Sequence, residues 1–486
     1  MKLSNYQQAI INFVADEDSD EHGIGSAYAG SGKTFLLQRC AEAVDDEVSM
    51  FFGAFNTPIA NELSKKIQRA NTEISTLHSL AYRTLRKHWR KENPKIPDGV
   101  DYLRVVVDDV LPKKIDPDVA GDIHTLVEKA MAFVADDDAD KAHDRVTELM
   151  YRFQCSPADE RITPPDQYVE WALNVLARLR EPSSTICFGQ MIYVPAYHRW
   201  PTGHFRRVFI DETQDMNRAQ LIAAKSALHE HGRFFAVGDR KQAIYAWNGA
   251  DTASMDKIKR TFKAREFKLP ISYRAPESVA ELVREYIPDF QARSDAPRGL
   301  VKTVTTAFMR EHWRPGDFFL SRKNAPLPKA CLMALRDGVP AYIKGGKDMT
   351  KGLFALIAKS RKHDIGEFLG WLKDYGEKRH AVLVAAKQER NAEELLDTTA
   401  ALVELSDGCD TTHELRQRLN KLFVDENPDG KLMVSSVHRA KGLETEDGRA
   451  VWLDAKSFRT TSDEERNIAY VAQTRTRDKL YFVKDQ

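Results

Sequence analysis

The residues best suited to chemistry in this chain of 486 residues lie at positions 27–34, with the sequence AYAGSGKT. This stretch follows a short strand-like run and precedes an apolar helical pattern. Glycines let backbone N–H groups close around phosphate oxygens, and a helix N-terminus adds partial positive charge. Lys33 would reach the β- and γ-phosphates of a nucleotide, and the Thr34 hydroxyl would ligate Mg²⁺. A glycine-rich turn before a helix is the simpler alternative.

Two adjacent carboxylates, Asp211 and Glu212, end a second apolar run at residues 207–210. Asp211 could hold the Mg²⁺ shell, and Glu212 could orient and deprotonate an attacking water molecule. A strand followed by an acidic helix cap would give the same pattern, but it does not account for Lys33 and Thr34 as well. A third apolar run, residues 234–237, leads to Gln242, which could sense the γ-phosphate.

Three further features have two interpretations each. Gln7 could pair with an adenine edge, because an amide offers a donor and an acceptor, or it could be an exposed residue at a helix start. Tyr245 and Trp247 could stack on bases, at about 1–3 kcal/mol per base, or pack in a core. The two interpretations are equally weighted for Tyr245, and core packing is the weaker one for Trp247. The basic tract at residues 83–91 could be a nucleic-acid edge or a solvated helix face.

Composition sets the frame that must position these residues. The length exceeds one ordinary core, so we expect two to four domains. No apolar run approaches a membrane span and no signal peptide opens the chain, so we expect a cytoplasmic protein with no membrane partner. The five scattered cysteines are expected to be reduced and mostly buried. The balance of 72 basic and 72 acidic residues neither supports nor excludes nucleic-acid binding.

The motifs recur in an order that resembles superfamily 1 helicases of the UvrD/Rep/PcrA type. The stretch AFNTPIA at residues 54–60 also resembles the F-box DNA helicases. In the order of the family's motifs, the matching positions are Gln7 (Q motif), residues 27–34 (I), 55–63 (Ia), 76–79 (Ib), 211–215 (II), 238–250 (III), 272–274 (IV), 436–444 (V) and 469–475 (VI). The family loop begins with alanine, so Ala27 is no defect. The sequence departs from the family's usual residues at Asn248, Ser436, Gln473 and Thr476.

The resemblance implies ATP and Mg²⁺ as cofactors and assigns roles to numbered positions. Lys33, Asp211, Glu212, Gln242, Arg274 and Arg475 would be catalytic, with the two arginines contacting the γ-phosphate. Thr34 and Asp211 would hold the metal. Nucleotide binding would involve Gln7, Ala29, Gly30, Ser31, Gly32, Lys33, Thr34, Tyr273 on the base and Glu444 on the ribose. Single-stranded DNA would contact Phe55, Asn56, His78, Tyr245, Trp247 and His438.

The same resemblance implies an α/β fold with two RecA-like P-loop NTPase cores, parallel sheets and a mainly helical insertion in each core. The expected segments are 1–91 and 205–265 for the first core and 92–204 for its insertion, and then 266–351 and 429–486 for the second core with a reduced insertion at 352–428. In that second insertion we expect a core made of Phe368, Leu369, Trp371, Leu372, Leu395, Leu396, Leu402 and Leu405.

The expected activity is that of an ATP-dependent DNA helicase or translocase, with single-stranded DNA and its junctions with duplex as partners. Lys441 to Glu444 resemble the 3′→5′ branch of the family. Two alternatives stay open: a translocase that displaces proteins with little unwinding, and a non-enzymatic DNA-binding module with a decayed ATP site. An RNA substrate is also open, because no residue is seen to read the 2′-hydroxyl.

Overall fold

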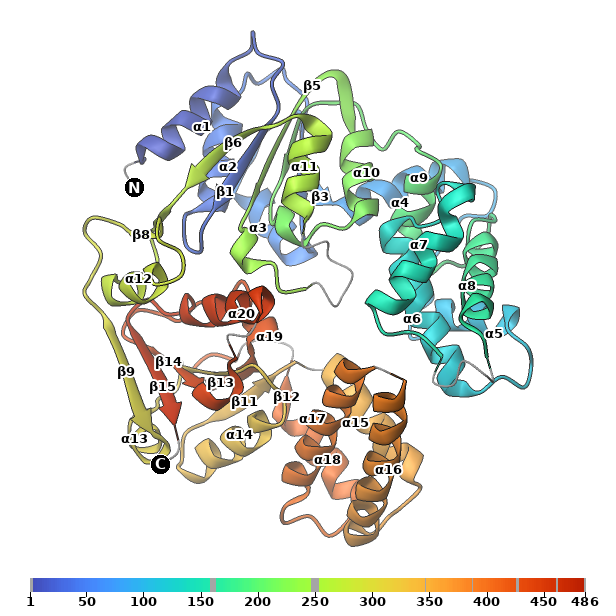
Figure 1. The fold of residues 1–486 in the computed structure, drawn as a ribbon. Coiled ribbons are helices and arrows are strands. Elements are labelled where there is room, and N and C mark those ends of the chain that lie inside the picture. The colour runs from blue at the N-terminus through green and yellow to red at the C-terminus, as the bar shows by residue number, and fades with distance from the viewer. Residues whose placement is uncertain are drawn as a thin grey trace. The chain divides into compact units, whose positions relative to one another are not determined.

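The chain folds into two compact units, each built on a parallel β-sheet (Figure 1). The computed structural model describes residues 3–157, 163–245, 253–345, 347–386, 388–424, 428–459 and 462–484. The first unit comprises residues 1–28 and 32–269, and the second comprises residues 29–31 and 270–486. The expected α/β class with two RecA-like cores is confirmed.

The sheet of the first unit has the strand order β3-β2-β4-β5-β1-β6. Its strands are β1 (Gly23–Ala27), β2 (Met50–Ala54), β3 (Thr72–Thr76), β4 (Phe205–Ile210), β5 (Leu228–Gly238) and β6 (Arg265–Leu269). Neighbouring residues of the central strands enter different cores: Phe51, Val208 and Phe234 join one cluster, and Phe52, Phe209 and Phe235 join the other. Burial on both faces explains the nearly continuous apolar runs in the sequence.

Helices cover both faces of this sheet. The cluster on one face includes residues of α1 (Asn5–Ala15), α2 (Lys33–Ala43) and α3 (Thr57–Lys66). The other includes residues of α4 (Leu77–His88), α9 (Gln190–Tyr197), α10 (Arg218–Ser226) and α11 (Ser254–Phe262). That second cluster continues into four helices, α5 (Tyr102–Val110), α6 (Pro117–Phe133), α7 (Ala139–Arg152) and α8 (Pro165–Leu179). The expected segment boundaries stay predictions.

The sheet of the second unit has the order β12-β11-β13-β10-β14-β15-β9. These strands are β9 (Leu300–Thr305), β10 (Phe318–Ser321), β11 (Ala341–Lys344), β12 (Phe423–Val424), β13 (Leu432–Ser436), β14 (Ala450–Asp454) and β15 (Lys479–Lys484). A separate parallel pair is formed by β7 (Ile271–Ser272) and β8 (Gln291–Ala292). The helices of this part are α12 (Glu277–Arg284), α13 (Thr306–His312), α14 (Pro326–Arg336), α19 (Val437–Ala440) and α20 (Asp463–Gln473).

Four more helices in the second unit occupy the region expected to be a small helical insertion. They are α15 (Lys347–Ser360), α16 (Ile365–Ala385), α17 (Glu389–Ser406) and α18 (Thr412–Leu422). Phe368, Leu372, Leu402 and Leu405 are buried as expected. The expectation for Leu396 is wrong, because its side chain is 48% exposed: an amphipathic helix presents only one stripe to the core, and Leu396 lies outside it.

All five cysteines are free and buried, as the sequence predicted. Burial raises the pKa of the Cys187 thiol to about 11, which keeps it protonated and unreactive near neutral pH. Among the described residues, no helix combines the length and the apolar character needed to cross a membrane.

Candidate nucleotide-binding and nucleic-acid-binding sites

The carboxyl ends of β1, β4 and β5 gather the predicted nucleotide-binding residues of the first unit. The three strands are parallel neighbours in the order β4-β5-β1, so their carboxyl ends share one edge of the sheet. Lys33 begins α2 after β1, Asp211 and Glu212 follow β4, and Gln242 lies in the short helix η2 (Arg240–Gln242) after β5. The structure therefore brings together side chains that are 178 to 209 residues from Lys33 in the sequence.

The glycine loop before α2 has the backbone that a phosphate-binding loop needs. Gly30 and Gly32 have φ values of +75° and +79°, in the left-handed region that residues with a Cβ rarely adopt. A Cβ on Gly30 would also lie 2.7 Å from the Cβ of Arg274. The Tyr273 N–H donates to the Gly30 carbonyl at 2.8 Å, and the Ala29 N–H donates to the Tyr470 hydroxyl at 2.7 Å. These bonds group residues 29–31 with the second unit, and they engage one N–H that was expected to face phosphate.

The charged centre of the edge is an ion pair between Lys33 Nζ and Glu212 Oε1 at 3.2 Å. Asp211 is 4% exposed, and its Oδ1 accepts the Glu212 N–H at 2.8 Å. Burial, together with the charge of Glu212, raises the pKa of Asp211 to about 7, although the charge of Lys33 opposes this shift. Two carboxylates facing one ammonium leave a deficit of positive charge at this edge.

That deficit fits a divalent cation, for which Asp211 and the Thr34 hydroxyl, in the first turn of α2, are the predicted ligands. Among the described residues, no group of three or more His, Cys, Asp or Glu side chains is placed to hold a metal. Mg²⁺ usually takes one or two protein ligands and fills its remaining positions with water and substrate phosphates. The residues present therefore fit Mg²⁺ bound together with a nucleotide.

Gln214, which the sequence analysis did not single out, links the two carboxyl-end loops. Its Nε2 donates to Glu212 Oε2, and its Oε1 accepts the Asp239 N–H at 2.9 Å. Asp239 Oδ2 in turn accepts from Gln242 Nε2 at 2.7 Å. Glu212 has a left-handed backbone, with a φ of +52°. This conformation costs free energy, and it persists only where the surrounding contacts hold it in place. The only signal in the sequence was the position of Gln214 beside the two carboxylates.

Gln7 is 1% exposed, so its interpretation as an exposed helix-start residue is wrong. Ser4 caps α1, and its N–H donates to Gln7 Oε1 at 3.0 Å in a reciprocal capping box. The amide nitrogen of Gln7 is 3.5 Å from the place that a Cβ on Gly32 would occupy. Gln7 therefore lies against the glycine loop, and its contact with adenine stays a prediction.

In the second unit, the residue predicted to contact the γ-phosphate, Arg274, is hydrogen-bonded to the residue predicted to contact the ribose, Glu444. Arg274 Nε donates to Glu444 Oε2, and Arg477 Nη2 donates to Glu444 Oε1. Burial would raise the pKa of Glu444, but the charges and hydrogen bonds of Arg274 and Arg477 outweigh it and hold that pKa low. Arg475 is 1% exposed and donates to the carbonyls of Val471 and Leu443 at 2.9 and 3.0 Å. These two backbone carbonyls therefore hold the guanidinium group of Arg475 in place.

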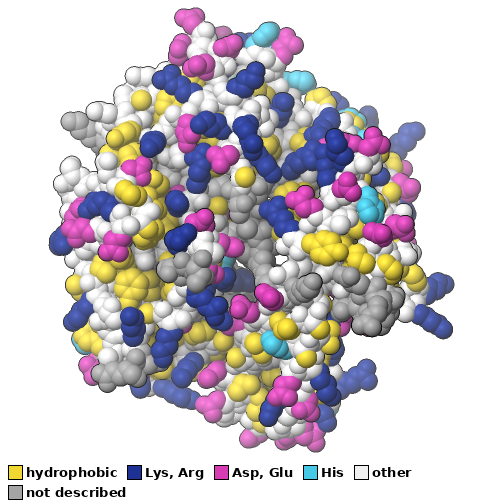
Figure 2. All heavy atoms as spheres, viewed as in Figure 1, with side chains coloured by type: hydrophobic (Ala, Val, Ile, Leu, Met, Phe, Trp, Pro, Cys, Tyr) yellow, Lys and Arg dark blue, Asp and Glu magenta, His cyan; other side chains and the backbone are white. Residues whose placement is uncertain are grey.

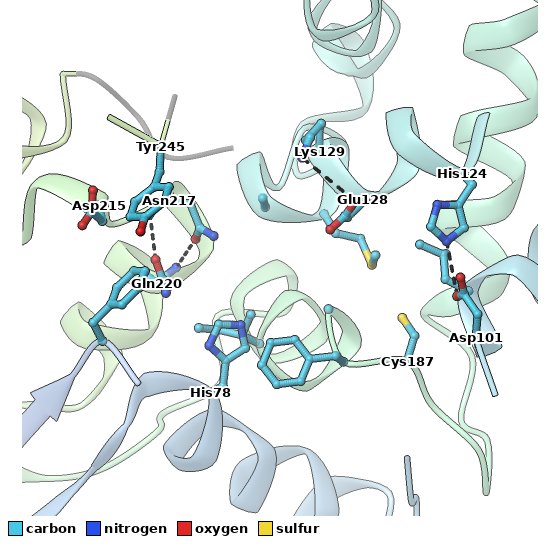
Figure 3. A pocket seen from close by; sticks show the side chains of 17 residues that line it. His78, Asp101, His124, Glu128, Lys129, Cys187, Asp215, Asn217, Gln220 and Tyr245 are labelled. Atoms are coloured by element: carbon cyan, nitrogen blue, oxygen red, sulfur yellow. Dashed lines mark hydrogen bonds and ion pairs between the residues drawn. The ribbon is translucent and has the colours of Figure 1, made fainter. Parts of the chain in front are cut away.

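A pocket of about 500 Å³ in the first unit is lined by three of the six predicted nucleic-acid contacts, Phe55, His78 and Tyr245 (Figure 3). Phe55, just after β2, stacks with Tyr245, with ring centroids 6.4 Å apart and planes 10° from parallel. His78 on α4 stacks with Phe188 at 4.5 Å and 21°. Phe188 is 60% exposed and was missed, because one phenylalanine in an apolar stretch gives no signal.

The remaining predicted contacts are placed as follows. Asn56 caps α3 by accepting the Ile59 N–H at 3.0 Å, which uses a side-chain oxygen that was expected to face DNA. Tyr245 is half-buried, so neither the core nor the fully exposed interpretation describes it. His438 is half-buried in α19 of the second unit. Trp247 and Asn248 lie outside the described residues.

The parallel sheet, the glycine loop and the buried carboxylates at its edge define a P-loop NTPase. The UvrD/REP helicase N-terminal domain family matches this chain at residues 21–179 and 195–263. The ATP-dependent DNA helicases PcrA of Staphylococcus aureus and Staphylococcus epidermidis are each 24% identical to it over 298 residues. The chain belongs to the UvrD/Rep/PcrA-like superfamily 1 helicases. The likeness to F-box DNA helicases stays a prediction.

The similarity covers only part of each protein. The aligned region is 56% of this chain and 38% of either PcrA. Apart from residues 29–31, the family match falls in the first unit, which contains the glycine loop residues from Gly32 onward, the carboxylate pair and the aromatic pocket.

We expect Gln214→Leu to lower the turnover number for ATP by up to about 100-fold, because a small misplacement of a catalytic group has costs of that order. The KM for ATP should change little, because Gln214 contacts Glu212 and Asp239 rather than the glycine loop. Steady-state ATP hydrolysis without nucleic acid would measure both constants.

Gln190→Leu is the matched control for that variant. Gln190 is also a buried glutamine with both amide ends bonded, to the Cys187 N–H and the Leu179 carbonyl, each at 2.8 Å. A similar loss of turnover in both variants would show that Gln214 acts only on stability.

We also expect the stability of the protein to depend on the protonation of His78. Desolvation lowers the pKa of His78 from 6.5 to about 4. Between these values the unfolded chain binds the proton and the folded chain does not, so the free energy of unfolding falls as the pH is lowered. Above the unfolded value His78 contributes no such dependence.

His78→Gln should remove this part of the decline, as measured by chemical denaturation above and within that pH window. The control is His231→Gln, at a side chain that is 74% exposed. Parallel pH profiles for wild type and His78→Gln would contradict the prediction.

Proposed function

We propose that this protein is an ATP-dependent motor that moves on single-stranded DNA, in the cytoplasm. The observation that carries the proposal is the Lys33–Glu212 ion pair beside buried Asp211, at the sheet edge where β1, β4 and β5 end. Family membership supports the same activity. ATP and Mg²⁺ are the proposed cofactors, and single-stranded DNA and its junctions with duplex are the proposed partners.

In this proposal each residue at the edge has one task. Mg²⁺, when bound with ATP, would neutralise charge on the phosphates. Gly30, Ser31, Gly32 and Lys33 would bind the phosphates, and Thr34 and Asp211 would hold the metal. Glu212 would orient the attacking water and accept its proton, for which it must exchange its contact with Lys33. Gln242 would respond to the γ-phosphate and pass the change through Asp239 and Gln214 to Glu212.

Arg274 and Arg475 of the second unit would stabilise charge on the transferred phosphoryl group, with Tyr273 on the base and Glu444 on the ribose. Arg274 is bonded to Glu444, so binding a phosphate requires it to exchange one acidic partner for another. Arg477 also donates to Glu444, and it can keep that carboxylate paired during the exchange.

Single-stranded DNA would enter the aromatic pocket of the first unit. The Phe55–Tyr245 and His78–Phe188 pairs offer ring faces to bases without reading their identity. We propose the six segments and the 3′→5′ polarity of the family for this chain as well.

A second candidate is a translocase that displaces proteins from DNA but separates little duplex. The small helical region of α15–α18 favours it, because it leaves limited surface for holding a duplex. A non-enzymatic module is disfavoured, because Lys33, Asp211 and Glu212, the groups that hydrolysis of a bound nucleotide requires, are all present at the sheet edge.

We expect ATP hydrolysis that single-stranded DNA strongly stimulates. Glu212→Gln should lower stimulated turnover by about 10²–10⁴-fold, the usual contribution of a general base. Asp463→Asn, at a carboxylate that is 88% exposed, is the control. If RNA stimulates hydrolysis and DNA does not, the substrate is RNA rather than DNA. If neither the wild type nor Glu212→Gln hydrolyses ATP, the protein is the non-enzymatic module.

We expect strand displacement from duplexes that carry a 3′ single-stranded tail and none from those that carry a 5′ tail. A motor moving 3′→5′ can load only on the first kind. Opening of 5′-tailed substrates alone would overturn the polarity. ATP-driven removal of a bound protein from single-stranded DNA, with neither duplex opened, would establish the translocase.

A further inference from the structure

Three arginines of the first unit converge on one carboxylate away from the nucleotide edge. The carboxylate belongs to Asp137, in the loop between α6 and α7, and its side chain is 5% exposed. Arg145 of α7 and Arg218 of α10 contact it at 2.5 and 2.6 Å, and Arg199, just after α9, is the third partner. We call Arg145, Arg199 and Arg218 the arginine cluster.

Positive charge in the arginine cluster exceeds the negative charge that pairs with it. Asp138 adds a carboxylate 3.9 Å from Arg145, but it also pairs with Lys141 at 3.1 Å. Four cations therefore share two carboxylates. Burial lowers the pKa of Arg218, Asp137 raises it, and Arg145 and Arg199 lower it further, so the net direction is downward. The attraction of the Asp137 carboxylate therefore does not offset the burial of Arg218 and its repulsion by Arg145 and Arg199.

The guanidinium groups also remain accessible. The side chains of Arg145, Arg199 and Arg218 are 30%, 50% and 34% exposed. Figure 2 shows Lys and Arg side chains gathered over the region of α9 and α10. A guanidinium has five donors in a planar fork that matches the oxygens of phosphate, so each arginine can keep Asp137 and bind a phosphate as well.

The surroundings of Trp200, beside the arginine cluster, indicate whether this surface would bind the bases or the phosphate backbone of a nucleic acid. Trp200 follows Arg199, and its ring lies between His88 at 3.8 Å and His198 at 4.7 Å, with nearly parallel planes. Both faces of Trp200 are covered, so it cannot stack on a base. The surface offers charge without an open ring face, which fits phosphates rather than bases.

The arginine cluster is continuous with the aromatic pocket along the chain. Arg218 begins α10 directly after Asn217 and shortly before Gln220, and both of these residues line the pocket (Figure 3). A nucleic acid held in the pocket would therefore pass close to the turn of α10 that begins at Arg218. An acidic protein segment would lack the regular row of charges that a nucleic acid presents.

We propose that the arginine cluster binds the phosphate backbone of the nucleic acid outside the aromatic pocket. This inference rests on the proposed function, because it takes nucleic acid as the substrate. The interaction is independent of sequence and adds to the salt dependence of binding.

The test measures binding of a fluorescent duplex with a 3′ single-stranded tail at several salt concentrations. The variant is Arg145→Gln with Arg199→Gln. We expect weaker binding for every sequence, and a salt slope lower by about 1 for each phosphate that the variant no longer binds. The matched control is Arg104→Gln with Arg178→Gln, at arginines 34% and 50% exposed that pair with Asp108 and Glu181 in the same helical region.

Unchanged affinity and salt slope in the folded double variant would overturn the inference and leave the arginines as a tether for the Asp137 loop. If that variant does not fold, Asp137→Asn decides: affinity and salt slope should rise, and unchanged values would overturn the inference. Poly-glutamate that binds wild type but not the variant, while DNA binding persists in both, would also overturn it in favour of an acidic protein. Failure of wild type to bind DNA would instead refute the proposed function.

Discussion

The ion pair between Lys33 and Glu212 is the interaction on which the nucleotide edge depends. It joins the first turn of α2 to the end of β4 across the intervening β5, with Asp211 buried beside it. The cost of desolvating both charges cancels much of the attraction in such an ion pair, so the pair adds little to stability. Its main effect is to hold the Lys33 and Glu212 side chains in fixed positions. One ammonium facing two carboxylates leaves the edge short of positive charge, which a bound metal ion would supply.

The sheet makes this arrangement possible because its polar chemistry can appear only at its ends. Both faces are filled by phenylalanine and aliphatic side chains that alternate between two cores. The loops at the carboxyl ends are where polar groups meet, and Gln214 bonds one loop to the next. The left-handed backbone of Glu212 is held by these neighbours, so the positions of Asp211 and Glu212 depend on the register of the sheet.

The same strands place the aromatic pocket. Phe55 follows β2, and β5 leads first to Gln242 and then to Tyr245, so one connection carries both a predicted nucleotide contact and a predicted base contact. A shift of Gln242 through Asp239 therefore has a short covalent route to the ring stack of Tyr245 on Phe55. Within the first unit, one short connection therefore joins the predicted nucleotide contact to the aromatic pocket.

The sequence by itself determined what depends on local patterns and residue types. Spacing and glycine placement predicted the phosphate loop, the buried strands and the carboxylate pair, because backbone conformation and side-chain period act over a few residues. Tertiary structure alone decided which distant groups meet. It buried Gln7 against Gly32, exposed Leu396, set Phe188 on His78 and brought Arg145, Arg199 and Arg218 to Asp137. These contacts depend on how sheets and helices pack, which no short stretch of sequence records.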